Sequence, residues 1–131
     1  MKTNKLILIV LLPGLMLLQS CKKVEKEMAV STGNYQNVLA NSAEVNGEII
    51  DLGEGATQYG HCYSTTQNPT TALPTKTAKG VPEVGEYTSN LTNLNPSTKY
   101  YVKAYISRGS DVAYGSEINF TTAVLTRSEA R

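Results

Sequence analysis

The feature that most constrains the fold of this chain is the stretch 94–106, LNPSTKYYVKAYI. It opens with Asn95-Pro96-Ser97, three residue types that favour a chain reversal. Alternate positions then separate into a mostly aliphatic set and a polar set: Tyr100, Val102, Ala104 and Ile106 against Tyr101, Lys103 and Tyr105. A period of two residues is typical of a strand that buries one face. The stretch therefore predicts a turn followed by a half-buried β-strand, with the first set in the core.

Further segments of the chain repeat this period and are separated by turn residues at a spacing of about ten residues. We expect strands at about 35–39, 42–52, 57–64, 85–91 and 115–122, and an edge strand near 76–79 within the Thr- and Pro-rich connection 65–80. No helical period appears after the first twenty residues. The sequence therefore predicts an all-β fold, a single sandwich of about seven antiparallel strands.

The N-terminal residues have the features of a secretory leader. Residues 1–5 carry two lysines, and residues 6–18 are almost wholly apolar, a run shorter than the 20 or so residues that a bilayer-spanning helix needs. The run ends in Leu18-Gln19-Ser20-Cys21, which resembles the lipobox of bacterial lipoproteins except for the large residue at Gln19. The resemblance implies that Cys21 becomes the acylated (palmitate-bearing) first residue of the mature protein. An ordinary signal peptide with an incidental cysteine is the alternative.

The predicted organisation has four parts: a lipoprotein signal peptide at 1–20, the lipidated cysteine with a flexible tether at 21–34, the sandwich at 35–123 and a polar tail at 124–131. Lys22 follows the cysteine, where the inner-membrane retention signal of some Gram-negative lipoproteins has an aspartate. We therefore expect a lipid anchor in the outer membrane of the cell envelope. The sequence leaves open whether the domain faces the periplasm or the cell surface.

The charge of the chain argues against a nucleic-acid partner, and its two cysteines leave two states open for Cys62, a free thiol or a disulfide. The net charge of +1 includes Lys2 and Lys5 of the leader, so the mature chain is close to neutral and has no basic stripe for a nucleic acid. If Cys21 is lipidated, Cys62 has no disulfide partner. A disulfide between the two cysteines is the alternative.

The motifs of the body carry a family resemblance. The pattern L-x-P-x-T-x-Y-x-V-x-A at 94–104 resembles the entry to strand F of fibronectin type III domains, and it implies that Tyr100 is a tyrosine corner bonded to backbone near the preceding turn. The likeness extends to a bacterial variant found in lipoproteins and surface proteins, through AEVNGEI, YGHCYS, YYVKAY and a YG hairpin. It covers about residues 35–122 and implies an immunoglobulin-like (fibronectin type III-like) sandwich.

The outward set of the central strand suggests a binding surface. Tyr101 and Tyr105 share one face, and Tyr114 follows in the next hairpin. A row of tyrosines can stack on sugar rings, which makes a glycan platform one hypothesis. Ordinary cross-strand packing of tyrosine is the alternative.

Two further residues with reactive side chains are interpreted as packing residues. His61, the only histidine, and Cys62 are adjacent in a predicted strand, so their side chains point to opposite faces and cannot join one site by themselves. We expect Tyr59, His61 and Tyr63 on the core face. The RGSD segment at 108–111 is interpreted as a turn built on glycine.

The sequence contains no glycine-rich phosphate loop, no paired carboxylates and no catalytic triad order, so we expect no enzyme activity, cofactor or metal. The predicted function is that of a membrane-anchored interaction module that binds an envelope protein or glycan. A passive spacer domain, or an accessory subunit of an envelope complex, is the alternative.

Overall fold

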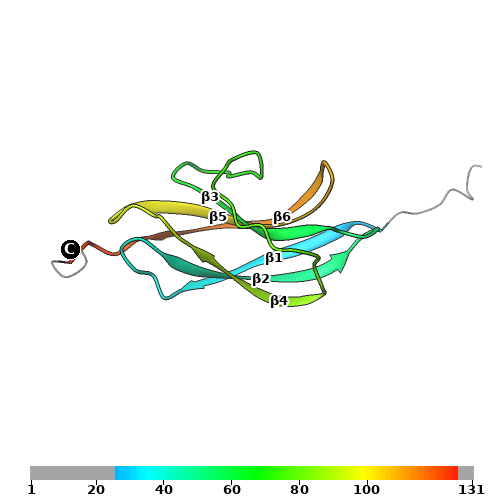
Figure 1. Cartoon of the computed structure of the whole chain (residues 1–131), viewed down its shortest axis with the longest axis horizontal. Helices are drawn as coiled ribbons and strands as arrows, with labels where there is room; N and C mark the ends of the chain where they lie inside the picture. The colour runs from blue at the N-terminus through cyan, green and yellow to red at the C-terminus, as the bar shows by residue number, and fades with distance from the viewer. Residues whose placement is uncertain (1–25, 127–131) are drawn as a thin grey trace, which may run out of the picture.

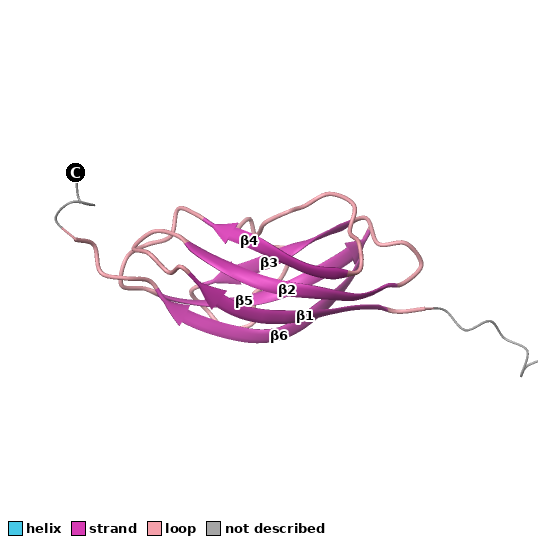
Figure 2. Ribbon diagram, turned by 90° about the horizontal axis from the view of Figure 1, so that it is seen from below, coloured by secondary structure: helices cyan, strands magenta, loops and turns pink. Residues whose placement is uncertain are grey.

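The computed structural model describes residues 26–126, and these form a sandwich of two antiparallel sheets. The strands are β1 Met28–Gln36, β2 Ala43–Leu52, β3 Gln58–Ser64, β4 Gly85–Leu91, β5 Lys99–Arg108 and β6 Asp111–Thr121. One sheet has the order β1-β2-β4 and the other β3-β5-β6, and Figure 1 and Figure 2 show the two layers packed face to face. The predicted all-β sandwich is confirmed, with six strands in the described part of the chain rather than about seven.

The described chain enters the sandwich at one end and leaves it at the other, as Figure 1 shows. At the first end Met28 pairs with Leu52, and the tight β5–β6 turn lies between Arg108 and Asp111. At the opposite end the last residue of β6 pairs with Lys99. We call these the N-terminal end and the distal end.

Strands in which buried and exposed side chains alternate form where the sequence predicts them. In β2 the side chains of Ala43, Val45 and Ile49 are buried, and the polar residues between them are half-buried or exposed. In β5 the core set is buried as predicted, although the strand begins at Lys99 because the backbone of Ser97 takes a positive φ of 52° in the turn before it. Full burial of an aliphatic side chain contributes about 1.5–3 kcal/mol to stability. A shift of the strand by one residue would expose these side chains, so the strand register is strongly determined.

The core consists of two hydrophobic clusters, one toward each end of the sandwich. Tyr100, Val102 and Phe120 from one sheet meet Val45 and Leu91 from the other in the first cluster. The second cluster joins the two sheets in the same way through Val30, Ile49, Ala56, Ala104 and Ile106.

The first strand differs from its prediction. β1 begins at Met28, so part of the predicted tether at 21–34 belongs to the sandwich, and the predicted strand at 35–39 overlaps only the end of β1. The register of β1 against β2 shifts twice, which breaks the period of two. At the second shift the Thr32 hydroxyl accepts a hydrogen bond of 2.9 Å from the Ala104 amide of the other sheet. β1 therefore ties the two sheets together along one side.

The connection 65–80 covers part of the outer face of the β3-β5-β6 sheet, where the Asn68 amide donates to the Glu117 carboxylate and the Thr71 amide donates to the Tyr114 hydroxyl, and it then runs along the edge of β3. It forms two isolated bridges, Cys62 with Lys76 and Tyr59 with Lys79, where the sequence predicted an edge strand at 76–79. Further along the same connection the side chain of Pro69 is fully buried. This cover has a direct consequence for the residues predicted to face outward from β3 and β5.

Candidate functional site

The predicted tyrosine platform is only partly exposed. Tyr105 is fully buried, and its hydroxyl donates a 2.7 Å hydrogen bond to the carbonyl of Thr77 in the covering connection. Burial raises the pKa of Tyr105 to about 12. The prediction that Tyr105 stacks on a ligand is therefore wrong, because the 65–80 segment occupies the space where the ligand would lie.

The other two tyrosines of the predicted platform are already engaged by other residues, although Tyr114 is the cross-strand partner of Tyr105. The hydroxyl of Tyr114 accepts a hydrogen bond from the Thr71 amide at 3.0 Å. The Lys103 ammonium lies 5.6 Å from the centre of the Tyr114 ring, and Lys99 lies 5.5 Å from the centre of the Tyr101 ring. These contacts cover ring faces that a sugar would need.

Tyr100 has the geometry expected of a tyrosine corner. Its ring is buried between the sheets and stacks on Phe120 with centroids 6.1 Å apart. Its hydroxyl accepts a hydrogen bond from the Asn95 amide at 2.9 Å, in the turn that precedes the strand. The residue therefore fixes the entry of the chain into β5.

His61 lies in a buried polar network that joins the two sheets. Its Nε2 donates to the Asn46 carbonyl at 3.0 Å, and because a carbonyl only accepts, Nδ1 is the unprotonated nitrogen that accepts from Ser89 Oγ at 2.8 Å. The Thr77 hydroxyl donates to Ser89 Oγ at 3.0 Å and completes the chain of bonds. Burial lowers the pKa of His61 to about 4, with a smaller contribution in the same direction from Lys79.

Cys62 lies on the opposite face of β3, under the covering connection. Its side chain is fully buried, and burial raises the pKa of the thiol to about 11. The sulfur lies 3.7 Å from the Lys103 carbonyl. A thiol held in its neutral form is a poor nucleophile, so this environment favours packing over reactivity.

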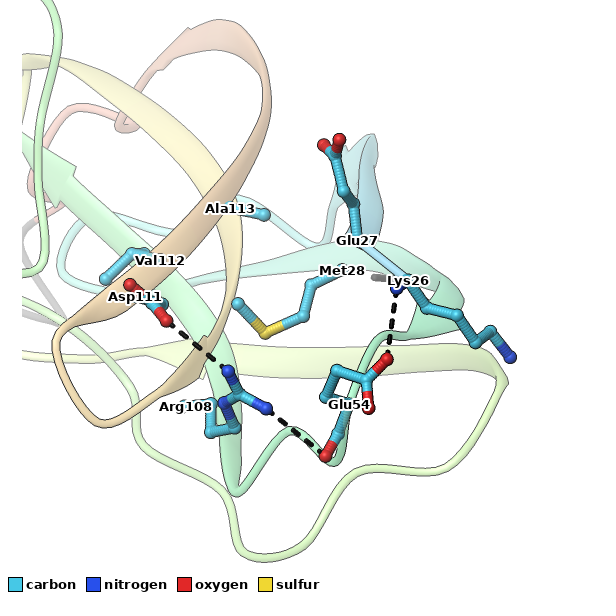
Figure 3. A pocket seen from close by; sticks show the side chains of 8 residues that line it. All are labelled: Lys26, Glu27, Met28, Glu54, Arg108, Asp111, Val112 and Ala113. Atoms are coloured by element: carbon cyan, nitrogen blue, oxygen red, sulfur yellow. Dashed lines mark hydrogen bonds and ion pairs between the residues drawn. The ribbon is translucent and has the colours of Figure 1, made fainter. Parts of the chain in front are cut away.

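A charged depression of about 280 Å³ lies at the N-terminal end, shown in Figure 3. Arg108 stands at its edge, where its guanidinium pairs with Asp111 at 3.6 Å and donates to the Glu54 carbonyl at 3.3 Å. Met28 and Ala113 contribute apolar side chains to the lining. The predicted RGSD turn is confirmed, because Gly109 adopts a φ of 61° that favours glycine and Arg108 and Asp111 pair across the turn.

An apolar surface at the distal end was missed by the sequence analysis. We call it the distal patch: it consists of the exposed side chains of Tyr35, Leu39, Val124 and Leu125. The Ala123 amide donates to the Leu39 carbonyl at 3.1 Å, which brings the C-terminal segment beside the β1–β2 loop. The predicted polar tail at 124–131 thus starts with two exposed aliphatic residues, and this pair was the available signal.

Two further predictions concern metal binding and attachment to the membrane. Among residues 26–126, no group of three or more His, Cys, Asp or Glu side chains is arranged to hold a metal ion. Within the same residues there is no helix long and apolar enough to cross a membrane. The predicted lipidation site, Cys21, lies outside the described residues.

Comparison with known proteins finds similarity in structure alone. No protein-family model matches the chain, and no curated protein matches it. The sensor domain of the anti-sigma factor RsgI4 from Pseudobacteroides cellulosolvens is similar in structure. Its short form matches with a TM-score of 0.56 and 16% identity over 75% of this chain and 96% of that one. Its solution structure gives a TM-score of 0.57 and 16% identity over 76% and 78% of the two chains.

A human fibronectin type III domain, from KIAA0970, matches over 74% of each chain with 16% identity and a TM-score of 0.49. At such identities a likeness concerns the fold alone. The strand order β1-β2-β4 against β3-β5-β6, with Tyr100 at the corner before β5, is the arrangement that the sequence motifs imply. The described chain is therefore a fibronectin type III-like β-sandwich, and it shares its fold with the RsgI4 sensor domain.

Proposed function

We propose that this protein is a lipoprotein of the cell envelope, held in the outer membrane through Cys21, and that its sandwich is a non-catalytic module for binding another protein. The leader and the lipobox-like sequence support the anchor. A binding role is in keeping with a fold that the RsgI4 sensor domain also adopts. The glycan alternative loses support because Tyr105 is buried and the Tyr114 ring faces Lys103.

The distal patch is the observation that carries the binding role. Leu39 and Val124 are 55% and 67% exposed, and they come from separate segments joined by the Ala123–Leu39 backbone bond. Grouped exposed aliphatic and aromatic side chains mark protein contacts more often than chance placement does. The patch also lies at the end of the sandwich opposite Met28, so a domain anchored through its N-terminus would present it away from the membrane (Figure 1).

Site-specific photo-cross-linking in intact cells tests this role. A photoreactive amino acid at Leu39 or Val124 is expected to give a discrete protein adduct, and one at Thr88, exposed on the β4 edge, is expected to give none. Substitution Tyr35→Ser should weaken the adduct at Leu39 several-fold. Equal labelling at all three positions, or none at any of them, would favour a passive spacer domain instead.

The anchor has a separate test. Cells that express the full-length protein or its Cys21→Ala variant are grown with labelled palmitate. The label is expected in the unaltered protein and not in the variant. Equal labelling of both proteins would rule out acylation at Cys21.

A further inference from the structure

A second apolar surface lies at the N-terminal end of the sandwich. We call it the N-terminal patch: it consists of the exposed side chains of Ile50, Val81 and Val84. Ile50 and Val84 line a depression of about 410 Å³, and Lys26 contributes to this depression and to the one in Figure 3. The patch and both depressions therefore share the end of the molecule at which the described chain begins.

The length of chain before Lys26 places this end close to the proposed anchor. Five residue steps separate Cys21 from Lys26, and a fully extended chain covers about 18 Å in that distance. β6, with 11 residues, is about 36 Å long at about 3.3 Å per residue. The tether is thus shorter than the sandwich, and a lipid at Cys21 would hold the N-terminal end beside the bilayer headgroups.

The charges around the N-terminal patch indicate which class of lipid headgroup it could contact without electrostatic repulsion. Among the described residues, carboxylates outnumber cations at this end: Glu27, Asp51, Glu54, Glu83, Glu86 and Asp111 against Lys26, Lys79 and Arg108. Lys26 and Arg108 are further engaged in ion pairs with Asp51 and Asp111. An anionic membrane surface would repel such an end, whereas zwitterionic headgroups would not.

We infer that the N-terminal end is a lipid-contacting surface, which rests on zwitterionic headgroups and places Ile50, Val81 and Val84 in the interface. This inference depends on the proposed anchor at Cys21. Three aliphatic side chains would bind a free protein only weakly, but the tether keeps them at a high effective concentration near the bilayer. The domain then has a defined orientation, with the distal patch away from the membrane.

Depth-dependent quenching tests the contact. Full-length lipidated protein is reconstituted into vesicles of phosphatidylethanolamine and phosphatidylcholine, and a fluorophore is attached at Val84→Cys or at Val124→Cys. These positions are matched, because their side chains are 65% and 67% exposed. The buried Cys62 does not compete for the label. A nitroxide on the lipid headgroup is expected to quench the fluorophore at position 84 several-fold more than the one at position 124.

Substitutions provide the second measurement. Ile50→Ser should reduce quenching at position 84, whereas Leu39→Ser, at an equally exposed distal position (both 55%), should leave it unchanged. Equal quenching at positions 84 and 124, in protein that floats with the vesicles, would overturn the lipid contact and leave the anchor intact. Failure of the wild type to float would overturn the anchor and the contact together.

The preference for zwitterionic headgroups is tested by changing the lipid composition of the vesicles. Replacing part of the lipid with phosphatidylglycerol should lower quenching at position 84, and raising the salt concentration should restore it, because salt screens the repulsion. Quenching that is insensitive to phosphatidylglycerol would overturn the zwitterionic preference.

Discussion

Single side chains of this sandwich fix the path of the backbone, and the tyrosine corner, which ties the turn at Asn95 to β5, is the clearest case. The Tyr100 hydroxyl is the acceptor for the Asn95 amide, and the ring around it is buried. Tyr100→Phe leaves that amide without its partner, so we expect a loss of about 1–2 kcal/mol in the free energy of unfolding. Urea unfolding measures this loss: the midpoint concentration of urea should fall, and the dependence of the free energy on urea concentration should not change. Tyr101→Phe, on the outer face of the same strand, is the control and should change the free energy by less than about 0.5 kcal/mol.

His61 makes the stability of the domain depend on pH. Its pKa is about 4 in the folded protein and 6.5 in the unfolded chain, so as the pH falls the unfolded chain binds the proton first. The stabilising contribution of the neutral ring is complete above pH 6.5 and is lost as the pH falls toward 4. The loss amounts to about 3 kcal/mol at 1.36 kcal/mol per pH unit.

Comparison with His61→Gln isolates this effect, because the carboxylates of the chain titrate in both proteins. The free energy of unfolding is measured for each at pH 7.5, 5.5 and 4. The wild type should lose more stability than the variant over this range. Parallel curves for the two proteins would contradict the assignment.

At the scale of secondary-structure elements, the covering connection 65–80 gives the next prediction. Gly60 lies directly under it, and a β-carbon at this position would collide with the Thr77 carbonyl. Gly60→Ala should therefore displace the connection, uncover the Cys62 thiol and cost about 1–3 kcal/mol. The rate at which a thiol reagent modifies Cys62 is expected to rise several-fold. Gly80→Ala, where a β-carbon meets no atom within 4 Å, is the matched control and should leave the rate unchanged.

The same connection shows why the sequence predicts some elements and not others. β2 and β4 were predicted with nearly correct bounds because one face of each strand is buried or half-buried and more exposed residues alternate with it along most of the strand. The cover over β5 was not predictable from local sequence. It depends on contacts such as the Tyr105–Thr77 and Thr71–Tyr114 hydrogen bonds, which join residues 28 and 43 positions apart. The outward tyrosines were therefore assigned to a platform, although one of them lies in the interior.

At the scale of the whole molecule, the remaining question concerns where the folding unit begins. The sequence predicted a domain from residue 35, but β1 begins at Met28, buries Val30 and supplies the Thr32 hydroxyl to the Ala104 amide. These contacts join β1 to both sheets, so its removal exposes the edge of β2 and opens one side of the core. Such a loss affects the entire sandwich, because its sheets share one core and unfold together.

We therefore expect a fragment of residues 26–126 to fold and one of residues 35–126 to fail. The longer fragment should unfold in urea in a single cooperative transition. The shorter one should show no such transition and should bind a hydrophobic dye, since the inner face of β2 and β5 loses its cover. If the shorter fragment unfolded cooperatively at a similar midpoint, β1 would be an accessory strand and the boundary at residue 35 would stand. The two fragments differ only in nine residues, so the comparison measures what β1 contributes to the sandwich as a whole.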